Sequence, residues 1–174
     1  DQGTTDIQFI IKGAIKESGL LVLLNKYIKR KRGFHPFGKD FNVRNSPESI
    51  GDLINLCYDK IPKEQMPLLI GVGDTVTSNW DHSNNNWQRG GSDRGFLTLI
   101  QEIGKKYKLE NKVLFVNSSN KEVRRPTINK YTMEGVSDDK DILKFDAVFQ
   151  EGPDEYISWF EKLSAQRSSK YSKK

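Results

Sequence analysis

The residue with the clearest potential for chemistry is Asp74, which follows a short apolar run, Leu68–Val72, and a glycine, Gly73. A run of this length with proline before it and glycines at its end predicts a strand of a parallel sheet, buried on both faces. Open α/β sheets bind ligands just beyond the carboxyl ends of such strands, and a carboxylate there suits a hard cation such as magnesium. We therefore predict that Asp74 is a metal ligand. The alternative is that it begins a loop or caps a nearby helix.

The elements that would position Asp74 alternate along the chain. Apolar spacing and proline positions predict helices over Ala14–Ile28, Pro47–Lys60 with Ser46 as its cap, Arg94–Lys108 and Pro153–Ala165. Apolar runs predict strands over Ile7–Ile11, Leu68–Val72, Lys112–Val116 and Phe145–Phe149. Strands separated by helices favour the α/β class, with a Rossmann-like, three-layer parallel sheet. Fold class alone does not specify function.

Composition and charge exclude several classes of protein. The chain has 174 residues and a formal net charge of +5, which comes mainly from the end of the first predicted helix and from the carboxyl-terminal tail. Neither a zinc-finger nor a helix-turn-helix or ribonucleoprotein pattern accompanies this charge, so we do not expect nucleic-acid binding. No apolar run approaches the length of a membrane span, so no membrane partner is expected either. The single cysteine, Cys57, fits a reducing compartment, and we expect a cytoplasmic protein.

Several short motifs, in their order, resemble the haloacid-dehalogenase-type (HAD) phosphatases. Gly71–Thr77, with Asp74 at its centre, looks like the family's fourth motif, in which a strand-end acid holds magnesium. Lys12, before a glycine and a predicted helix, resembles the third motif, whose lysine neutralises the transferring phosphoryl group. The resemblance implies a Mg²⁺-dependent phosphatase in which Asp74 and Lys12 are catalytic. The alternative for Lys12 is a solvated lysine at a strand end.

The second acid of the fourth motif is displaced in this sequence. The family usually places it four or five residues after the first, where this chain has Ser78 and Asn79. Asp93, just before a predicted helix, and Asp81 are the two candidates, and we favour Asp93 as the second metal ligand because of its place before the helix. The alternative is that Asp93 only caps that helix.

The family's opening motif, Asp-x-Asp-x-Thr/Val after a strand, has no counterpart in this chain. The carboxylates of residues 138–141 lie in a polar segment without a preceding strand. We therefore expect an incomplete portion of the HAD-like fold over residues 1–165, with the nucleophile upstream, an inserted polar loop over residues 78–92 and a basic disordered tail over residues 166–174.

More narrowly, the motifs resemble the sugar phosphatases, and in particular the carboxyl-terminal part of the glucosylglycerol-phosphate phosphatases of cyanobacterial salt tolerance. The quoted motifs are Gly71–Ser78, the tryptophan- and asparagine-rich insertion, and Asp93–Leu97. The resemblance implies hydrolysis of glucosylglycerol 3-phosphate in the synthesis of an osmoprotectant. One alternative is a phosphatase for another sugar phosphate, of the sucrose or trehalose type. Another is a catalytically silent α/β module that binds a partner or nucleic acid through its basic face.

The inserted loop is the candidate for substrate selection. Trp80 and Trp87 could stack on a sugar ring, and Arg89 could hydrogen-bond its hydroxyls or phosphate. We add the hydroxyl residues Thr75 and Thr77, next to Asp74, as candidate substrate contacts. The alternative is that both tryptophans fold back onto the domain and anchor a long loop.

Overall fold

A parallel sheet of three strands lies at the centre of the fold. The computed structural model describes residues 15–118 and 133–171. Its parallel strands are arranged in the order β1 (Ile70–Gly73), β4 (Lys112–Val116) and β5 (Ala147–Phe149), with Gly73 paired to Phe115 and Val116 to Phe149. The predicted α/β class with a parallel sheet is confirmed. Among the strands that the structure describes, β1 has a partner on one side only.

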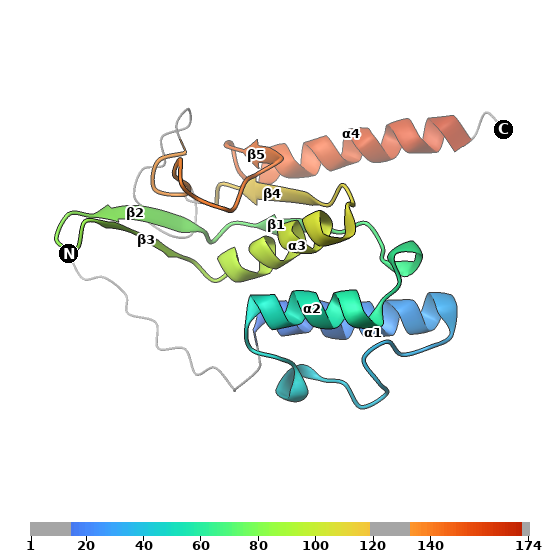
Figure 1. The fold of residues 1–174 in the computed structure, drawn as a ribbon. Helices are drawn as coiled ribbons and strands as arrows, with labels where there is room; N and C mark the ends of the chain where they lie inside the picture. Colours follow the sequence, from blue (N-terminus) through green and yellow to red (C-terminus); the bar gives the residue numbers. More distant parts are fainter. Residues whose placement is uncertain (1–14, 119–132, 172–174) are drawn as a thin grey trace.

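Helices cover both faces of the sheet (Figure 1). One face packs against α3 (Arg94–Tyr107), which is backed by α1 (Lys16–Arg32) and α2 (Ile50–Lys60), and α4 (Pro153–Tyr171) lies over the other face. Alternation along β4 accounts for the two layers, because successive side chains of a strand point to opposite faces. Val113 and Phe115 join the core with the first three helices, whereas Leu114 packs with Phe160 of α4.

Two glycines of β1 allow α3 to approach the sheet closely. A Cβ atom at Gly71 would lie 2.7 Å from Cδ1 of Ile100, and one at Gly73 would lie 2.8 Å from Cβ of Asp93. These separations are shorter than van der Waals contact, so larger residues would push α3 away from the strand. The glycines therefore bring the start of α3, and with it Asp93, against the end of β1.

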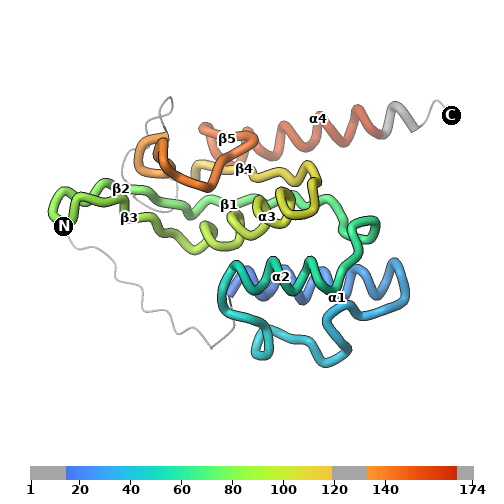
Figure 2. The backbone as a smooth tube through the Cα atoms, in the orientation of Figure 1, coloured from blue at the N-terminus to red at the C-terminus, as the bar shows by residue number. Residues whose placement is uncertain are grey.

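The segment predicted as a polar loop is a β-hairpin, so that prediction was wrong for most of residues 78–92. Strands β2 (Thr77–Asp81) and β3 (Asn86–Gly90) pair antiparallel, with Trp80 opposite Trp87. The backbone runs from β1 directly into β2, and from β3 directly into α3 (Figure 2). The hairpin therefore separates Asp74 from Asp93 in the sequence while its base holds the two ends together.

Other predicted boundaries shift by a few residues. Ser49, not Ser46, caps α2, and Pro47 lies before the helix rather than in its first turn. Helix α4 continues past Ala165 to Tyr171, into the segment expected to be a disordered tail. Two short 3-10 helices, Val43–Asn45 and Lys63–Gln65, complete the described elements. The predicted strand Ile7–Ile11 lies outside the described residues.

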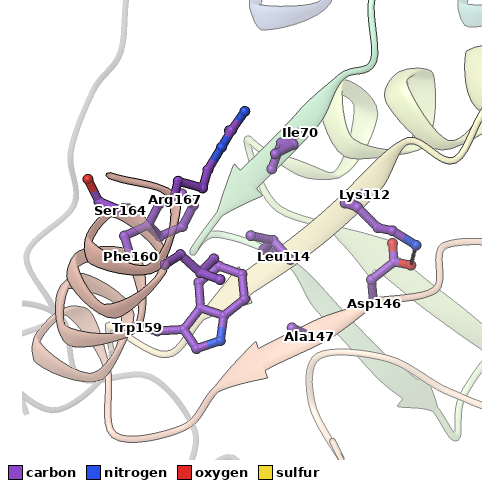
Figure 3. Close-up of a pocket in the computed structure, with 10 residues that line it drawn as sticks. Ile70, Lys112, Leu114, Asp146, Ala147, Trp159, Phe160, Ser164 and Arg167 are labelled. Carbon is purple, nitrogen blue, oxygen red and sulfur yellow. Dashed lines mark hydrogen bonds and ion pairs between the residues drawn. The ribbon is translucent and has the colours of Figure 1, made fainter. Parts of the chain in front are cut away.

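The predicted burial of β1 on both faces was also wrong. Leu68 is 67% exposed and Ile70 is 57% exposed, and an open groove separates Ile70 from α4. Ile70 instead forms one side of an open groove of about 750 Å³, whose other walls are Leu114, Trp159 and Phe160 (Figure 3). The groove is mostly apolar, although the ion pair between Lys112 and Asp146, at 3.2 Å, lies at its margin.

The basic end of α1 has a structural role at the helix terminus. Nζ of Lys29 donates a hydrogen bond to the carbonyl oxygen of Gly33 at 2.6 Å, and Gly33 ends the helix with a φ of +88°. Cations at this end offset the negative pole of the helix. Among residues 15–118 and 133–171, no helix has both the length and the apolar character that crossing a bilayer would require.

Candidate active site

Asp74 and Ser118 meet at the carboxyl ends of two neighbouring strands. Asp74 directly follows β1, and Ser118 follows β4 by two residues. Parallel strands end at the same edge of a sheet, so residues just beyond them become neighbours. Ser118 donates a hydrogen bond from Oγ to Oδ2 of Asp74 at 2.8 Å, and Thr75 donates one from Oγ1 to Oδ1 at 2.8 Å. The carboxylate of Asp74 therefore accepts hydrogen bonds from two hydroxyl groups, at the edge of the sheet where α/β folds bind ligands.

Ser118 is a site residue that the sequence analysis missed. A signal for it was present, because the strand ending at Val116 was predicted correctly and Ser118 stands at its carboxyl end. Applying the strand-end argument to β4 as well as β1 would have placed Ser118 next to Asp74.

Asp93 anchors the loop that carries Asp74. Its side chain lies at the start of α3, where the residue is 4% exposed, and Oδ2 accepts hydrogen bonds from the backbone amides of Asp74 at 2.9 Å and Thr75 at 3.0 Å. The amide of Asp93 in turn donates to the carbonyl oxygen of Thr75 at 3.1 Å. The side chain makes no capping hydrogen bond to α3, so it does not act as the predicted alternative, a helix cap.

Lys16, the first residue of α1, supplies the positive charge beside these acids. Its Nζ atom forms an ion pair with Oδ1 of Asp93 and lies 3.4 Å from Oγ of Ser92. The predicted cation, Lys12, lies outside the described residues. Sequence reasoning missed Lys16 because it belongs to the periodic pattern of a helix, where a lysine ordinarily faces solvent.

The ionisation of Asp93 follows from these contacts. Burial opposes the charged form, but hydrogen bonds from Lys16 and from the amides of Thr75 and Asp74, together with the charge of Lys16, lower the pKa of Asp93 below its ordinary value. The carboxylate is therefore ionised at neutral pH.

The donor set fits magnesium at Asp74 better than at Asp93. Among the described residues, no three histidine, cysteine or acidic side chains converge in a way that could hold a metal ion. Asp74 offers a carboxylate with hydroxyl oxygens beside it, which is the hard-oxygen chemistry that Mg²⁺ prefers. The carboxylate of Asp93 already accepts from two amides and an ammonium group. In the structure Asp93 therefore supports the loop that carries Asp74, and its predicted role as a second metal ligand stays a prediction.

Asp81, the other candidate for the second acid, lies at the far end of the hairpin. Its carboxylate accepts hydrogen bonds from the amide of Ser83 at 2.9 Å and from Nδ2 of Asn84 at 2.7 Å, so it shapes the turn between β2 and β3. The hydrogen bond from the Asn84 side chain is the main cause of a lowered pKa at Asp81. These hydrogen bonds give Asp81 a structural role in the turn.

The two tryptophans of the hairpin pack against each other. Their ring centroids are 5.3 Å apart with an interplanar angle of 71°, an edge-to-face arrangement. Trp80 remains 37% exposed, and neither ring belongs to the two buried apolar clusters of the fold. The tryptophans therefore stiffen the hairpin itself instead of anchoring it to the domain core, and they leave an aromatic surface in solvent.

Two other predicted substrate contacts have protein partners. Arg89 makes a two-pronged ion pair with Asp138, from Nε to Oδ2 and from Nη2 to Oδ1, both at 2.8 Å. Thr77 lies at the base of the hairpin, opposite Gly90, and its carbonyl oxygen accepts from Arg94 at 3.0 Å. The guanidinium group of Arg89 is thus paired with Asp138 in this structure, and its predicted contact with substrate stays a prediction.

Comparison with known proteins identifies the family of the chain. Residues 1–164 match the family described as Glucosylglycerol-phosphate phosphatase (Salt_tol_Pase). A glucosylglycerol-phosphate phosphatase from Synechocystis sp. is 39% identical over 183 residues, an alignment that covers 99% of this chain and 43% of that protein. The chain therefore spans less than half the length of this relative. No solved structure matches the chain. On the extent of the family match, the chain belongs to the glucosylglycerol-phosphate phosphatase family.

Proposed function

We propose that the full-length protein hydrolyses glucosylglycerol 3-phosphate to glucosylglycerol and phosphate, and that this chain supplies the carboxylate that holds magnesium. The observation that carries the proposal is the placement of Asp74 at the carboxyl end of β1, with Ser118 of the neighbouring strand and an anchored loop around it. Membership of the glucosylglycerol-phosphate phosphatase family supports the choice of substrate. The reaction would serve the synthesis of an osmoprotectant in the cytoplasm.

The chemistry of phosphoryl transfer requires positioning and charge neutralisation more than covalent assistance from the protein. A magnesium ion at Asp74 would neutralise charge that develops on the phosphoryl oxygens. Thr75 and Ser118 orient the carboxylate by donating to its two oxygens, and Asp93 fixes the backbone on which that carboxylate is mounted. Lys12 remains the proposed cation for the phosphoryl group, while Lys16 holds Asp93 in its ionised, anchoring state.

The nucleophilic aspartate is proposed to lie in the part of the full-length protein outside this chain. Of the three parallel strands described, only β1 is followed directly by an aspartate, and we assign that residue to magnesium. Trp80 and Trp87, on the hairpin that begins three residues after Asp74, are proposed to contact the glycosyl part of the substrate through their exposed surface.

The test compares phosphate release from glucosylglycerol 3-phosphate by the full-length protein and by its Asp74→Asn variant. We expect magnesium-dependent release by the unaltered protein, a loss of at least about a hundredfold in the variant, since an essential charge-stabilising group is removed, and no change in an Asp59→Asn control on α2. Release from sucrose or trehalose phosphate but not from glucosylglycerol 3-phosphate would redirect the proposal to another sugar phosphate. Absence of any phosphate release would overturn it.

A further inference from the structure

A buried pair of aspartates fastens the hairpin to the rest of the fold. Asp138 and Asp141 lie in the segment between β4 and β5, and their side chains are 1% and 0% exposed. Asp138 pairs with Arg89 on β3, and Asp141 pairs with Arg94 at the start of α3, just after the hairpin. A buried carboxylate is costly unless it is paired and fully hydrogen-bonded, so the completeness of these contacts decides how firmly the hairpin is held.

Asp138 is fully engaged with both strands of the hairpin. It accepts two hydrogen bonds from Arg89 of β3, one from Oγ of Ser78 on β2 at 2.5 Å, and one from the amide of Lys140 at 2.9 Å. The hydrogen bond from Arg89 is the main cause of a pKa of Asp138 well below its usual range. The backbone adds a further link, because the amide of Ser78 donates to the carbonyl oxygen of Gly135 at 2.9 Å.

Asp141 holds the base of the hairpin through Arg94. The guanidinium group of Arg94 donates from Nη1 and Nη2 to the two carboxylate oxygens of Asp141, both at 2.8 Å. The same group donates to the carbonyl oxygens of Thr77 at 3.0 Å and Gly90 at 3.3 Å, which are paired residues at the hairpin base. Arg94 is therefore bonded to both strands at once, and it directly follows Asp93.

These contacts connect the aromatic surface to the acid site. The hairpin is continuous with the Asp74 loop at one end and with Asp93 at the other, so a hinge at its base would move the tryptophans relative to Asp74. Asp138 and Asp141 remove that hinge by fixing two separate levels of the hairpin. A recognition surface must be held within a fraction of an ångström to contribute to substrate selection.

We propose that Asp138 and Asp141 are positioning residues for substrate selection. They hold the β2–β3 hairpin so that the exposed surface of Trp80 and Trp87 contacts the glycosyl part of a substrate whose phosphoryl group is bound at Asp74. The inference rests on the proposed function of the site. Neither aspartate touches substrate: Asp138 acts through Arg89 of the hairpin, and Asp141 acts through Arg94 at the start of α3. If either aspartate is replaced, we expect KM to rise only for substrates that carry a sugar.

The variant Asp138→Asn, made in the full-length protein, tests this inference. Asparagine keeps the shape of the side chain but turns one acceptor into a donor, which then faces Arg89 or Ser78. We expect KM for glucosylglycerol 3-phosphate to rise about tenfold, the result of weakening one charge-assisted hydrogen bond in the lock. For p-nitrophenyl phosphate, an ester without a sugar, kcat and KM are expected to stay within about twofold of their values in the unaltered protein, because this ester has no group that reaches the hairpin. Asp139→Asn, at the exposed neighbouring position, is the matched control and should behave as the unaltered protein.

A second variant and a structural readout keep the inference testable if Asp138→Asn does not fold. Arg89→Gln removes the cationic partner of Asp138, whose side chain is less buried than that of Asp138. It should produce the same rise in KM for the sugar-bearing substrate. In the double variant the effects should be less than additive, as they are for residues in one network. Amide exchange across residues 77–90 should accelerate in each variant, while exchange in the middle of α3 stays as it was.

The outcomes separate the inference from the proposed function. An unaltered protein that releases no phosphate from glucosylglycerol 3-phosphate would refute the proposed function. An active protein whose variants lose both substrates equally, lose neither, or keep the amide exchange of the hairpin unchanged would overturn the positioning role of Asp138 and leave the proposed function standing.

Discussion

Replacing Asp93 with asparagine separates two roles for this acid, an anchor for the Asp74 loop and a ligand for magnesium. The asparagine oxygen can still accept from the amides of Asp74 and Thr75, which now bond to Oδ2. The amide nitrogen, however, replaces Oδ1 and places a donor against the ammonium group of Lys16. The substitution therefore removes the ion pair and leaves two donors facing each other, with almost no change in volume.

The size of the effect follows from the exposure of the two partners. A hydrogen bond to a charged group contributes about 1.5–3 kcal/mol when it is protected from water. The Asp93 side chain is buried, but that of Lys16 is 52% exposed, so water compensates part of the loss. We expect the loop to be destabilised by about 1–2 kcal/mol, at the lower end of that range because of screening. A change of this size accelerates local opening roughly 5- to 30-fold.

Amide hydrogen exchange in metal-free, full-length protein measures this change directly. The amides of Asp74 and Thr75 should exchange faster by that factor in Asp93→Asn, and Asp59→Asn should leave their rates unaltered. Magnesium titration of both variants then supplies the second readout. Unchanged exchange at Asp74 and Thr75, combined with complete loss of magnesium binding, would refute the reasoning, because it would make Asp93 a ligand rather than an anchor.

Three further predictions concern the same region. Folding lowers the pKa of Asp93, so at a pH between its folded and unfolded pKa values the unfolded state binds more protons. Protection of the Thr75 amide from hydrogen exchange should therefore be complete above about pH 4 and be lost as the pH falls through the folded pKa. Gly91 has a φ of +100° and its Cβ position overlaps the backbone of Thr75, so Gly91→Ala should destabilise the protein by about 1–3 kcal/mol in denaturant titration, and an unchanged midpoint would contradict the required conformation. Alanine at both Trp80 and Trp87 should raise KM for the sugar phosphate far more than for p-nitrophenyl phosphate; equal effects on the two substrates would exclude sugar contact.

The parallel sheet and its principal acid could be predicted from the sequence because local signals agree there. A short apolar run, a proline before it and glycines within it identify the strand that ends before Asp74, and Lys112–Val116 was predicted with correct bounds. Asp93 was placed correctly just before a helix. Its hydrogen bonds to the Asp74 loop could not be predicted, because the two amides that donate to it lie 18 and 19 residues earlier in the chain.

The hairpin could not be predicted because its strands lack an apolar face. Thr77–Asp81 and Asn86–Gly90 are polar on both sides except for the tryptophans, so alternation gives no strand signal. The strands are held by the contact between Trp80 and Trp87 and by the carboxylate of Asp138, which lies 60 residues from its partner Ser78 in the sequence. The turn also lacks the usual glycine, although Asn85, with a φ of +50°, takes the left-handed conformation that asparagine tolerates.

The hairpin also has a consequence for how such proteins can diverge. Its two strands leave and rejoin the fold at adjacent points, Thr77 opposite Gly90, with Asp74 and Asp93 just outside. Deleting or adding two residues in each strand would shorten or lengthen the hairpin without moving either acid. A step of two residues keeps each side chain on its original face of the hairpin. If the hairpin selects the substrate as proposed, a change in its length would alter which organic groups are accepted and would leave the geometry around Asp74 in place.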